Sequence, residues 1–125
     1  MTDTYKHYIS GTENPKLTYT SQIGTHSIIL EIDTKRREAL VNTMDIKLES
    51  PVELTLLLKK ISCDLKEKKI DRIIQQVSEN EWIELKRQGI FKYINENTRF
   101  KFINIYSETE LFPEAVMKGI GFVDI

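Results

Sequence analysis

Residues 50–81, SPVELTLLLKKISCDLKEKKIDRIIQQVSENE, carry the strongest local signals in the chain and decide its fold. Ser50, Pro51 and Glu53 supply a serine N-cap, a proline at the first helical position and a glutamate where a capping box needs one. Five apolar residues then recur at helical spacing: Leu54, Leu57, Leu58, Ile61 and Leu65. This pattern predicts one amphipathic helix that ends near residue 66.

The apolar residues of 70–77 lie on the opposite side of that helical pattern. At about 100° per residue, one straight helix cannot bury both sets. A second serine-x-x-glutamate, Ser78 to Glu81, starts a fresh helix that ends at Gly89. Residues 70–77 are therefore predicted to form a central strand, with a helix as the open alternative.

Alternating apolar and polar residues on both sides of this stretch predict two hairpins. Residues 28–48 alternate around a polar tip, and residues 91–105 do the same around a polar loop. A last helix is expected near Pro113, because proline is tolerated in a first helical turn, and it ends at Gly119. Residues 120–125 are left open as a final strand.

The resulting order is ββαβαββα, with a final β left open. We expect an α+β fold for residues 17–125, a single two-layer domain. Its sheet is mostly antiparallel and has two or three helices on one face. Residues 1–16 are polar and include Gly11, Asn14 and Pro15, so they are expected to form a loose N-terminal arm.

The composition is that of a folded domain and argues against several functional classes. The 125 residues include 18 Lys and Arg against 19 Asp and Glu, for a formal net charge of −1. General nucleic-acid binding usually needs a strongly basic domain, so nucleic acid is not an expected partner. The single cysteine, Cys63, excludes a disulfide framework and a multi-cysteine zinc site.

Residues 1–7 are too polar for a signal peptide, and no apolar run approaches about 20 residues, so no membrane partner is expected. We expect a cytoplasmic protein. The excess of Ile and Lys over Ala is typical of AT-rich genomes, such as those of phages and large DNA viruses, and a viral protein would act in the host cytoplasm.

The sequence assembles no catalytic, cofactor or metal site. His7 and His26 are expected at surface or edge positions, because neither lies at ligand spacing from Cys, Asp or Glu. Cys63 has no histidine near it in the sequence and is expected to be a buried or half-buried, inert thiol. None of the 5 glycines opens a helix after a strand, which argues against a phosphate-binding loop. We therefore expect no catalytic residue, no cofactor and no metal.

Lys35, Arg36 and Arg37 form a basic tip between the first two predicted strands. The tip is either a solvated turn or a contact for an acidic protein partner, and an exposed edge strand can pair with a second copy of the chain. The first functional hypothesis is therefore a small non-enzymatic protein-interaction module, adaptor or regulatory, that self-associates.

Phe100 and Phe102 support a second hypothesis, single-stranded RNA binding. The element order of residues 70–125 resembles the ferredoxin-like fold of RNA-recognition motifs, and the two rings resemble the aromatic half of their stacking motif. Thr98 and Arg99 stand where that motif has a basic residue and a glycine. The resemblance implies that both rings stack on bases, whereas simple alternation would place them in the core.

The element order also resembles the core of the acetyl-coenzyme-A-dependent N-acyltransferases, in which a hairpin leads into a long helix, a strand, a helix and a final pair of strands. The resemblance implies an N-acyltransferase-like fold, active or degenerate. That family binds the cofactor's pyrophosphate with a glycine-containing turn, whereas residues 47–52 here are KLESPV. Pro51 lacks an N–H group and Glu49 adds negative charge, so this turn is expected to bind a phosphate weakly. A chain with this fold is expected to have lost cofactor binding.

Overall fold

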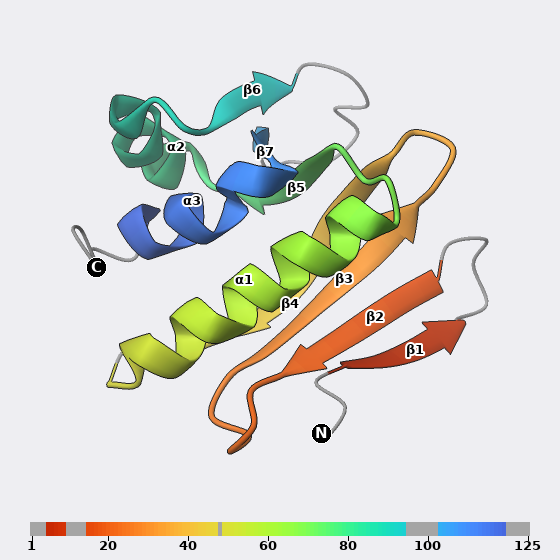
Figure 1. Cartoon of the computed structure of the whole chain (residues 1–125). Helices are drawn as coiled ribbons and strands as arrows, with labels where there is room; N and C mark the ends of the chain where they lie inside the picture. The colour runs from red at the N-terminus through yellow and green to blue at the C-terminus, as the bar shows by residue number, and fades with distance from the viewer. Residues whose placement is uncertain (1–4, 10–14, 48, 95–102, 120–125) are drawn as a thin grey trace.

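The computed structural model describes residues 5–9, 15–47, 49–94 and 103–119. They form one seven-stranded sheet with α1 and α3 on the same face (Figure 1). The strands are β1 (Tyr5–Ile9), β2 (Pro15–Thr20), β3 (Ser27–Asp33), β4 (Glu38–Asp45), β5 (Arg72–Val77), β6 (Lys92–Ile94) and β7 (Ile103–Glu108). The helices are α1 (Pro51–Glu67), α2 (Glu79–Leu85) and α3 (Phe112–Gly119).

The strand order in the sheet is β1-β2-β3-β4-β5-β7-β6. Among the described pairs, β4 with β5 is parallel and the other five are antiparallel. The predicted α+β class with a mostly antiparallel sheet is therefore confirmed. None of the described helices is long and apolar enough to cross a membrane.

Helix α1 begins and ends close to the predicted residues, and its apolar stripe packs on the sheet. Leu54, Leu58, Ile61 and Leu65 are fully buried against a core that includes Ile28 and Leu30 of β3. Burial of each such side chain contributes about 1.5–3 kcal/mol. The predicted cap differs in its contacts, because the Ser50 side chain makes no capping hydrogen bond. Pro51 and the burial of the apolar stripe therefore determine where the helix starts, without a capping box.

The segment after α1 is a strand, as predicted. β5 lies between β4 and β7 in the middle of the sheet. The predicted capping box between β5 and α2 is present. The Glu81 N–H donates to Ser78 Oγ at 3.2 Å, and the Ser78 N–H donates to Glu81 Oε1 at 3.0 Å. Gly89, with a φ of 74°, ends the turn Lys86–Gln88 that follows α2.

The N-terminal residues differ from the expected loose arm. Tyr5–Ile9 and Pro15–Thr20 are antiparallel strands, and β2 continues the sheet from β3. Leu17 and Tyr19 are both buried, and they alternate with the less buried Thr18. This alternation, with strand-favouring Thr and Tyr, brings Pro15 and Lys16 into the sheet.

The C-terminal half contains the predicted second hairpin, β6 and β7, and the predicted last helix, α3, with Pro113 as its second residue. Helix α3 lies beside α1. The Ser62 hydroxyl donates to the Thr109 carbonyl at 2.9 Å, and Thr55 Oγ1 lies 3.9 Å from Met117 Sδ. The predicted final strand over residues 120–125 lies outside the described residues.

Candidate functional site

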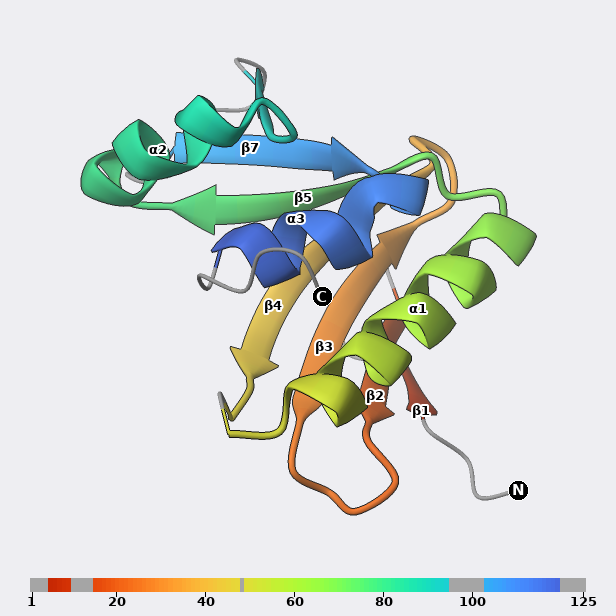
Figure 2. The ribbon, with the colours of Figure 1, turned by 60° about the vertical axis from the view of Figure 1, so that its left-hand side comes forward.

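Strands β4 and β5 run parallel over a short stretch and then separate (Figure 2). The paired residues are Glu38 with Arg72, Ala39 with Ile73, and Leu40 with Ile74. Beyond them β4 continues to Asp45 and β5 to Val77 without pairing to each other. We call this opening the β4–β5 fork; its arms are residues 41–45 and 75–77.

The outer edge of each arm is paired to a neighbouring strand. The β4 arm pairs with β3, and the β5 arm pairs with residues 103–105 of β7. Within the described residues, the inner edges face no strand. Their backbone N–H and C=O groups can therefore pair with an extended ligand, as exposed strand edges do.

A β-bulge lies at the start of the β4 arm. Leu30 of β3 pairs with Val41 and Ile29 pairs with Thr43, so Asn42 has no opposite residue. The side chains of Asn42 and Thr43 are exposed. A bulge bends its strand and increases the local twist, and bulges are common beside active sites. The bulge thus bends β4 just after it leaves β5, and it exposes a carboxamide at the fork.

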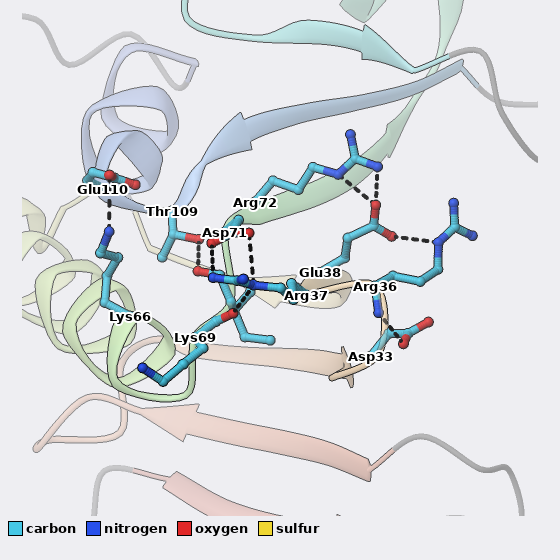
Figure 3. A network of polar contacts seen from close by, with 11 residues as sticks. Asp33, Arg36, Arg37, Glu38, Lys66, Lys69, Asp71, Arg72, Thr109 and Glu110 are labelled. Carbon is cyan, nitrogen blue, oxygen red and sulfur yellow. Dashed lines mark hydrogen bonds and ion pairs between the residues drawn. The ribbon is translucent and has the colours of Figure 1, made fainter.

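A buried ion pair holds the closed end of the fork (Figure 3). Glu38 is only 6% exposed, and its Oε2 accepts from Arg72 Nε at 2.6 Å and from Arg72 Nη2. Arg36 Nε lies 3.6 Å from the other Glu38 oxygen, and the Arg72 guanidinium lies over the Tyr106 ring. Because Glu38 and Arg72 are the first paired residues, this contact fixes where β4 and β5 meet.

Arg37 ties the turn between β3 and β4 to the junction between α1 and β5. Its Nε donates to the Lys69 carbonyl at 3.1 Å, and its Nη2 donates to Asp71 Oδ1 at 3.0 Å. The Asp71 N–H donates back to the Arg37 carbonyl at 2.8 Å. Two residues of the predicted basic contact, Arg36 and Arg37, thus face carboxylates of their own chain, while Lys35 is exposed at the tip. A contact of Lys35, Arg36 and Arg37 with a protein partner stays a prediction.

The His26 side chain holds the turn before α1 through two hydrogen bonds. This histidine is fully buried: its Nδ1 accepts from the Lys47 N–H at 3.1 Å, and its Nε2 lies 2.9 Å from the Ser50 carbonyl. These partners assign the neutral tautomer with the proton on Nε2. The surface or edge position expected for His26 is wrong. Its period-two spacing from Ile28 and Leu30, both buried, was the sequence signal for burial.

Side chains around the same turn are acidic and apolar. Glu49 is exposed, and Glu53 stands in the first turn of α1. Among the described atoms, the buried Glu53 Oε2 has no hydrogen-bond partner. Lys47 Nζ lies 3.5 Å from the Asp45 carboxylate, which offsets its charge. Val52 is 68% exposed. The turn is a poor environment for an anion.

The remaining sequence candidates are Cys63, Phe100 and Phe102. Cys63 is exposed, so the expected burial of its thiol is wrong. Phe100 and Phe102 lie outside the described residues, and base stacking on them stays a prediction. Within the part of the chain that the structure describes, no group of three or more His, Cys, Asp or Glu side chains could hold a metal ion.

The chain is similar in fold to N-acyltransferases of known structure. A proposed acyl-CoA N-acyltransferase from Klebsiella pneumoniae matches with a TM-score of 0.54 and 7% identity, over 81% of this chain and 76% of that one. An acetyltransferase of the GNAT family from Staphylococcus aureus matches with a TM-score of 0.52 and 14% identity, over 77% and 68%. A variant of spermidine N-acetyltransferase from Vibrio cholerae matches with a TM-score of 0.51 and 14% identity, over 82% and 69%. No protein-family model matches the chain, and no curated protein matches it.

These likenesses correct the first functional hypothesis. A small non-enzymatic adaptor or regulatory module was inferred because no catalytic constellation could be read from the sequence. The structural neighbours instead favour the alternative, an N-acyltransferase-like fold. The reason for the error is physical: the fork is made from backbone edges and strand divergence, which leave no side-chain motif in the sequence.

Proposed function

We propose that the chain acts as an N-acyltransferase-type protein and that its β4–β5 fork binds the acyl-thioester donor. The observation that carries this proposal is the separation of β4 from β5 after Leu40 and Ile74. It occurs in a sheet whose fold resembles that of acyl-CoA N-acyltransferases and acetyltransferases.

The arm of such a donor suits the fork. Pantetheine is a thin, extended chain with amide groups and ends in the sulfur that carries the acyl group. The inner edges of residues 41–45 and 75–77 offer backbone donors and acceptors at the spacing of a strand. Gln75 and Gln76 add half-buried amides on the β5 arm. The arm would thus bind as an extra strand segment between β4 and β5.

The proposed reaction is acyl transfer to an amine. The amine nitrogen attacks the thioester carbonyl carbon, a C–N bond forms and the C–S bond breaks. The amine loses one proton and the sulfur leaves as a free thiol, so the products are an amide and a thiol. The exposed Asn42 carboxamide can donate to the carbonyl oxygen, where negative charge develops in the transition state.

Binding is tested by titrating ¹⁵N-labelled protein with S-acetyl-pantetheine and following the backbone amide signals. We expect the largest shifts at residues 41–45 and 75–77. A Lys35→Ala variant, changed at the distant tip, should give the same shifts. Shifts confined to other parts of the chain, or none up to the solubility limit of the ligand, would refute the proposal.

Transfer is tested by thiol release with a panel of amines that includes a polyamine and a lysine peptide. Because Cys63 is exposed and would react with a thiol reagent, the assay uses a Cys63→Ser background. We expect amine-dependent release above the rate without protein. Ligand binding without release for any amine would support the degenerate form of the fold.

A further inference from the structure

We infer that the donor is recognised by its pantetheine arm alone, and that the chain has no binding site for the nucleotide diphosphate of coenzyme A. The substrate class is then an acyl-pantetheine thioester, whatever its arm is attached to. This inference rests on the proposed function, and it concerns the turn before α1 rather than the fork.

Two backbone N–H donors of this turn are already used within the chain, and a third position has none. The Lys47 N–H donates to His26 Nδ1 at 3.1 Å, and the Ser50 N–H donates to the Lys47 carbonyl at 3.3 Å. The Leu54 N–H donates to the Ser50 carbonyl at 3.1 Å, and Pro51 has no N–H group. A diphosphate at a helix N-terminus is bound mainly by such N–H groups. In this turn the Lys47 and Ser50 N–H groups are bonded within the chain, and Pro51 supplies none.

The side chains add a second, independent obstacle. Glu49 and Glu53 flank the start of α1, and among the described atoms the buried Glu53 Oε2 has no hydrogen-bond partner. The nearby cation, Lys47, lies 3.5 Å from Asp45. Val52 and Leu56 present exposed apolar side chains on the same helix. A diphosphate placed here would meet negative charge and an apolar surface.

The two parts of coenzyme A therefore meet different surfaces. The fork offers neutral backbone groups and the side chains of Asn42, Gln75 and Gln76, and the one carboxylate of its arms, Asp45, lies 3.5 Å from Lys47 Nζ. The turn before α1 offers the carboxylates of Glu49 and Glu53, and its Lys47 and Ser50 N–H groups are already bonded within the chain. The diphosphate and the nucleotide thus add nothing to the affinity of the arm.

The experiment compares acetyl-coenzyme A with S-acetyl-pantetheine by calorimetry at moderate salt. We expect acetyl-coenzyme A to bind no more tightly than S-acetyl-pantetheine, and both to bind more weakly than micromolar. Binding of acetyl-coenzyme A that is tenfold tighter, or micromolar, would overturn the inference while leaving the fork as the donor site. If neither compound binds, the proposed function itself fails.

A gain-of-binding variant provides the second test. Replacing the exposed Glu49 by Gly removes one charge and frees the turn, so acetyl-coenzyme A should bind about fivefold more tightly while S-acetyl-pantetheine is unchanged. Glu84→Gln removes the same charge from exposed α2 and is the matched control. An equal effect of Glu49→Gly on both compounds, or of Glu84→Gln on acetyl-coenzyme A, would contradict the role assigned to the turn.

Discussion

The two ends of the β4–β5 pair are built from different interactions. At the closed end, Glu38 and Arg72 form a buried ion pair, and Arg37 and Asp71 lock the neighbouring junctions. At the open end, the arms carry Asn42, Thr43, Gln75 and Gln76, with Asp45 as their one charged residue, and Asn42 bulges out of register. A fork inside a sheet needs a clamp, which here is the ion pair between Glu38 and Arg72. Strong local contacts where the strands meet let the arms stay apart without support from each other.

The same comparison explains why the sheet can leave inner edges unpaired. Unpaired edges invite pairing with other chains, and proteins limit this with bulges, short strands and polar side chains. The β4–β5 fork has a bulge in one arm and a short second arm of residues 75–77. A thin ligand can enter where a whole strand would not pair easily.

Breaking the clamp should have the largest effect. The Glu38 side chain is only 8% exposed, and Arg72→Met removes the main partner of its carboxylate. Removing one member of a fully buried pair costs about 3–5 kcal/mol. Because Arg72 is 27% exposed and Arg36 stays 3.6 Å from Glu38, we expect the lower end, about 3 kcal/mol, which urea unfolding would measure. The double variant Arg72→Met with Glu38→Gln removes the stranded charge and should recover part of the loss. A loss below about 1 kcal/mol for Arg72→Met would show that the pair is not the clamp.

Removing the bulged carboxamide tests the open end. Asn42 is exposed, so Asn42→Ala should leave the free energy of unfolding nearly unchanged. If its amide stabilises the carbonyl oxygen during transfer, the rate should fall by about 100-fold. Amine-dependent thiol release measures it, with Thr43→Ser as a neighbouring control. An unchanged rate would remove Asn42 from the site.

Loosening the turn beside the open end should have a moderate effect. His26→Phe keeps an aromatic ring but loses the hydrogen bonds to Lys47 and Ser50. Since the two backbone groups are left without their partners, we expect a loss of about 2–3 kcal/mol by urea unfolding. His26→Gln can keep one of the bonds and should lose less. If the two variants were equally stable, the bonds would not be what holds the turn.

The smallest effect is expected at the periphery of the closed end, where Lys66 Nζ lies 3.1 Å from Glu110 Oε2. The Glu110 backbone N–H and then the Lys66 ammonium hold the pKa of the Glu110 carboxyl below its usual 4.5. A lowered pKa stabilises the fold above pH 4.5, and this contribution is lost as the pH falls through the folded-state pKa. Because both side chains are more than half exposed, the contribution is below about 1 kcal/mol.

The measurement is the free energy of unfolding as a function of pH for the natural chain and for Glu110→Gln. The two curves should converge at acidic pH and separate slightly at neutral pH. A larger difference in acid than at neutral pH would reverse the sign of this contribution.

Local chemistry was enough to predict much of the fold. The capping box at Ser78 and Glu81, the apolar stripe of α1 and the alternation in β3 depend on neighbours within a few residues, and all are present. The strand at β1 was missed because residues 1–16 are polar, and the burial of His26 was missed although its period-two spacing from Ile28 and Leu30 indicated it. The element order already resembled that of N-acyltransferases.

The candidate site was much less predictable. The KLESPV turn indicated poor phosphate binding from Pro51 and Glu49 alone, and the structure adds that the Lys47 and Ser50 N–H groups are bonded to His26 and to the Lys47 carbonyl. The fork could not be read from the sequence. It arises because pairing stops after Leu40 and Ile74, and neither residue differs in type from those of an ordinary buried strand.

The most direct test of the account is whether a ligand arm lies between β4 and β5. Isotope-filtered NMR would detect contacts between the geminal methyl groups of bound S-acetyl-pantetheine and backbone amides of labelled protein. We expect contacts to both arms of the β4–β5 fork, residues 41–45 and 75–77. Contacts to one arm only, or to surfaces away from the fork, would contradict it.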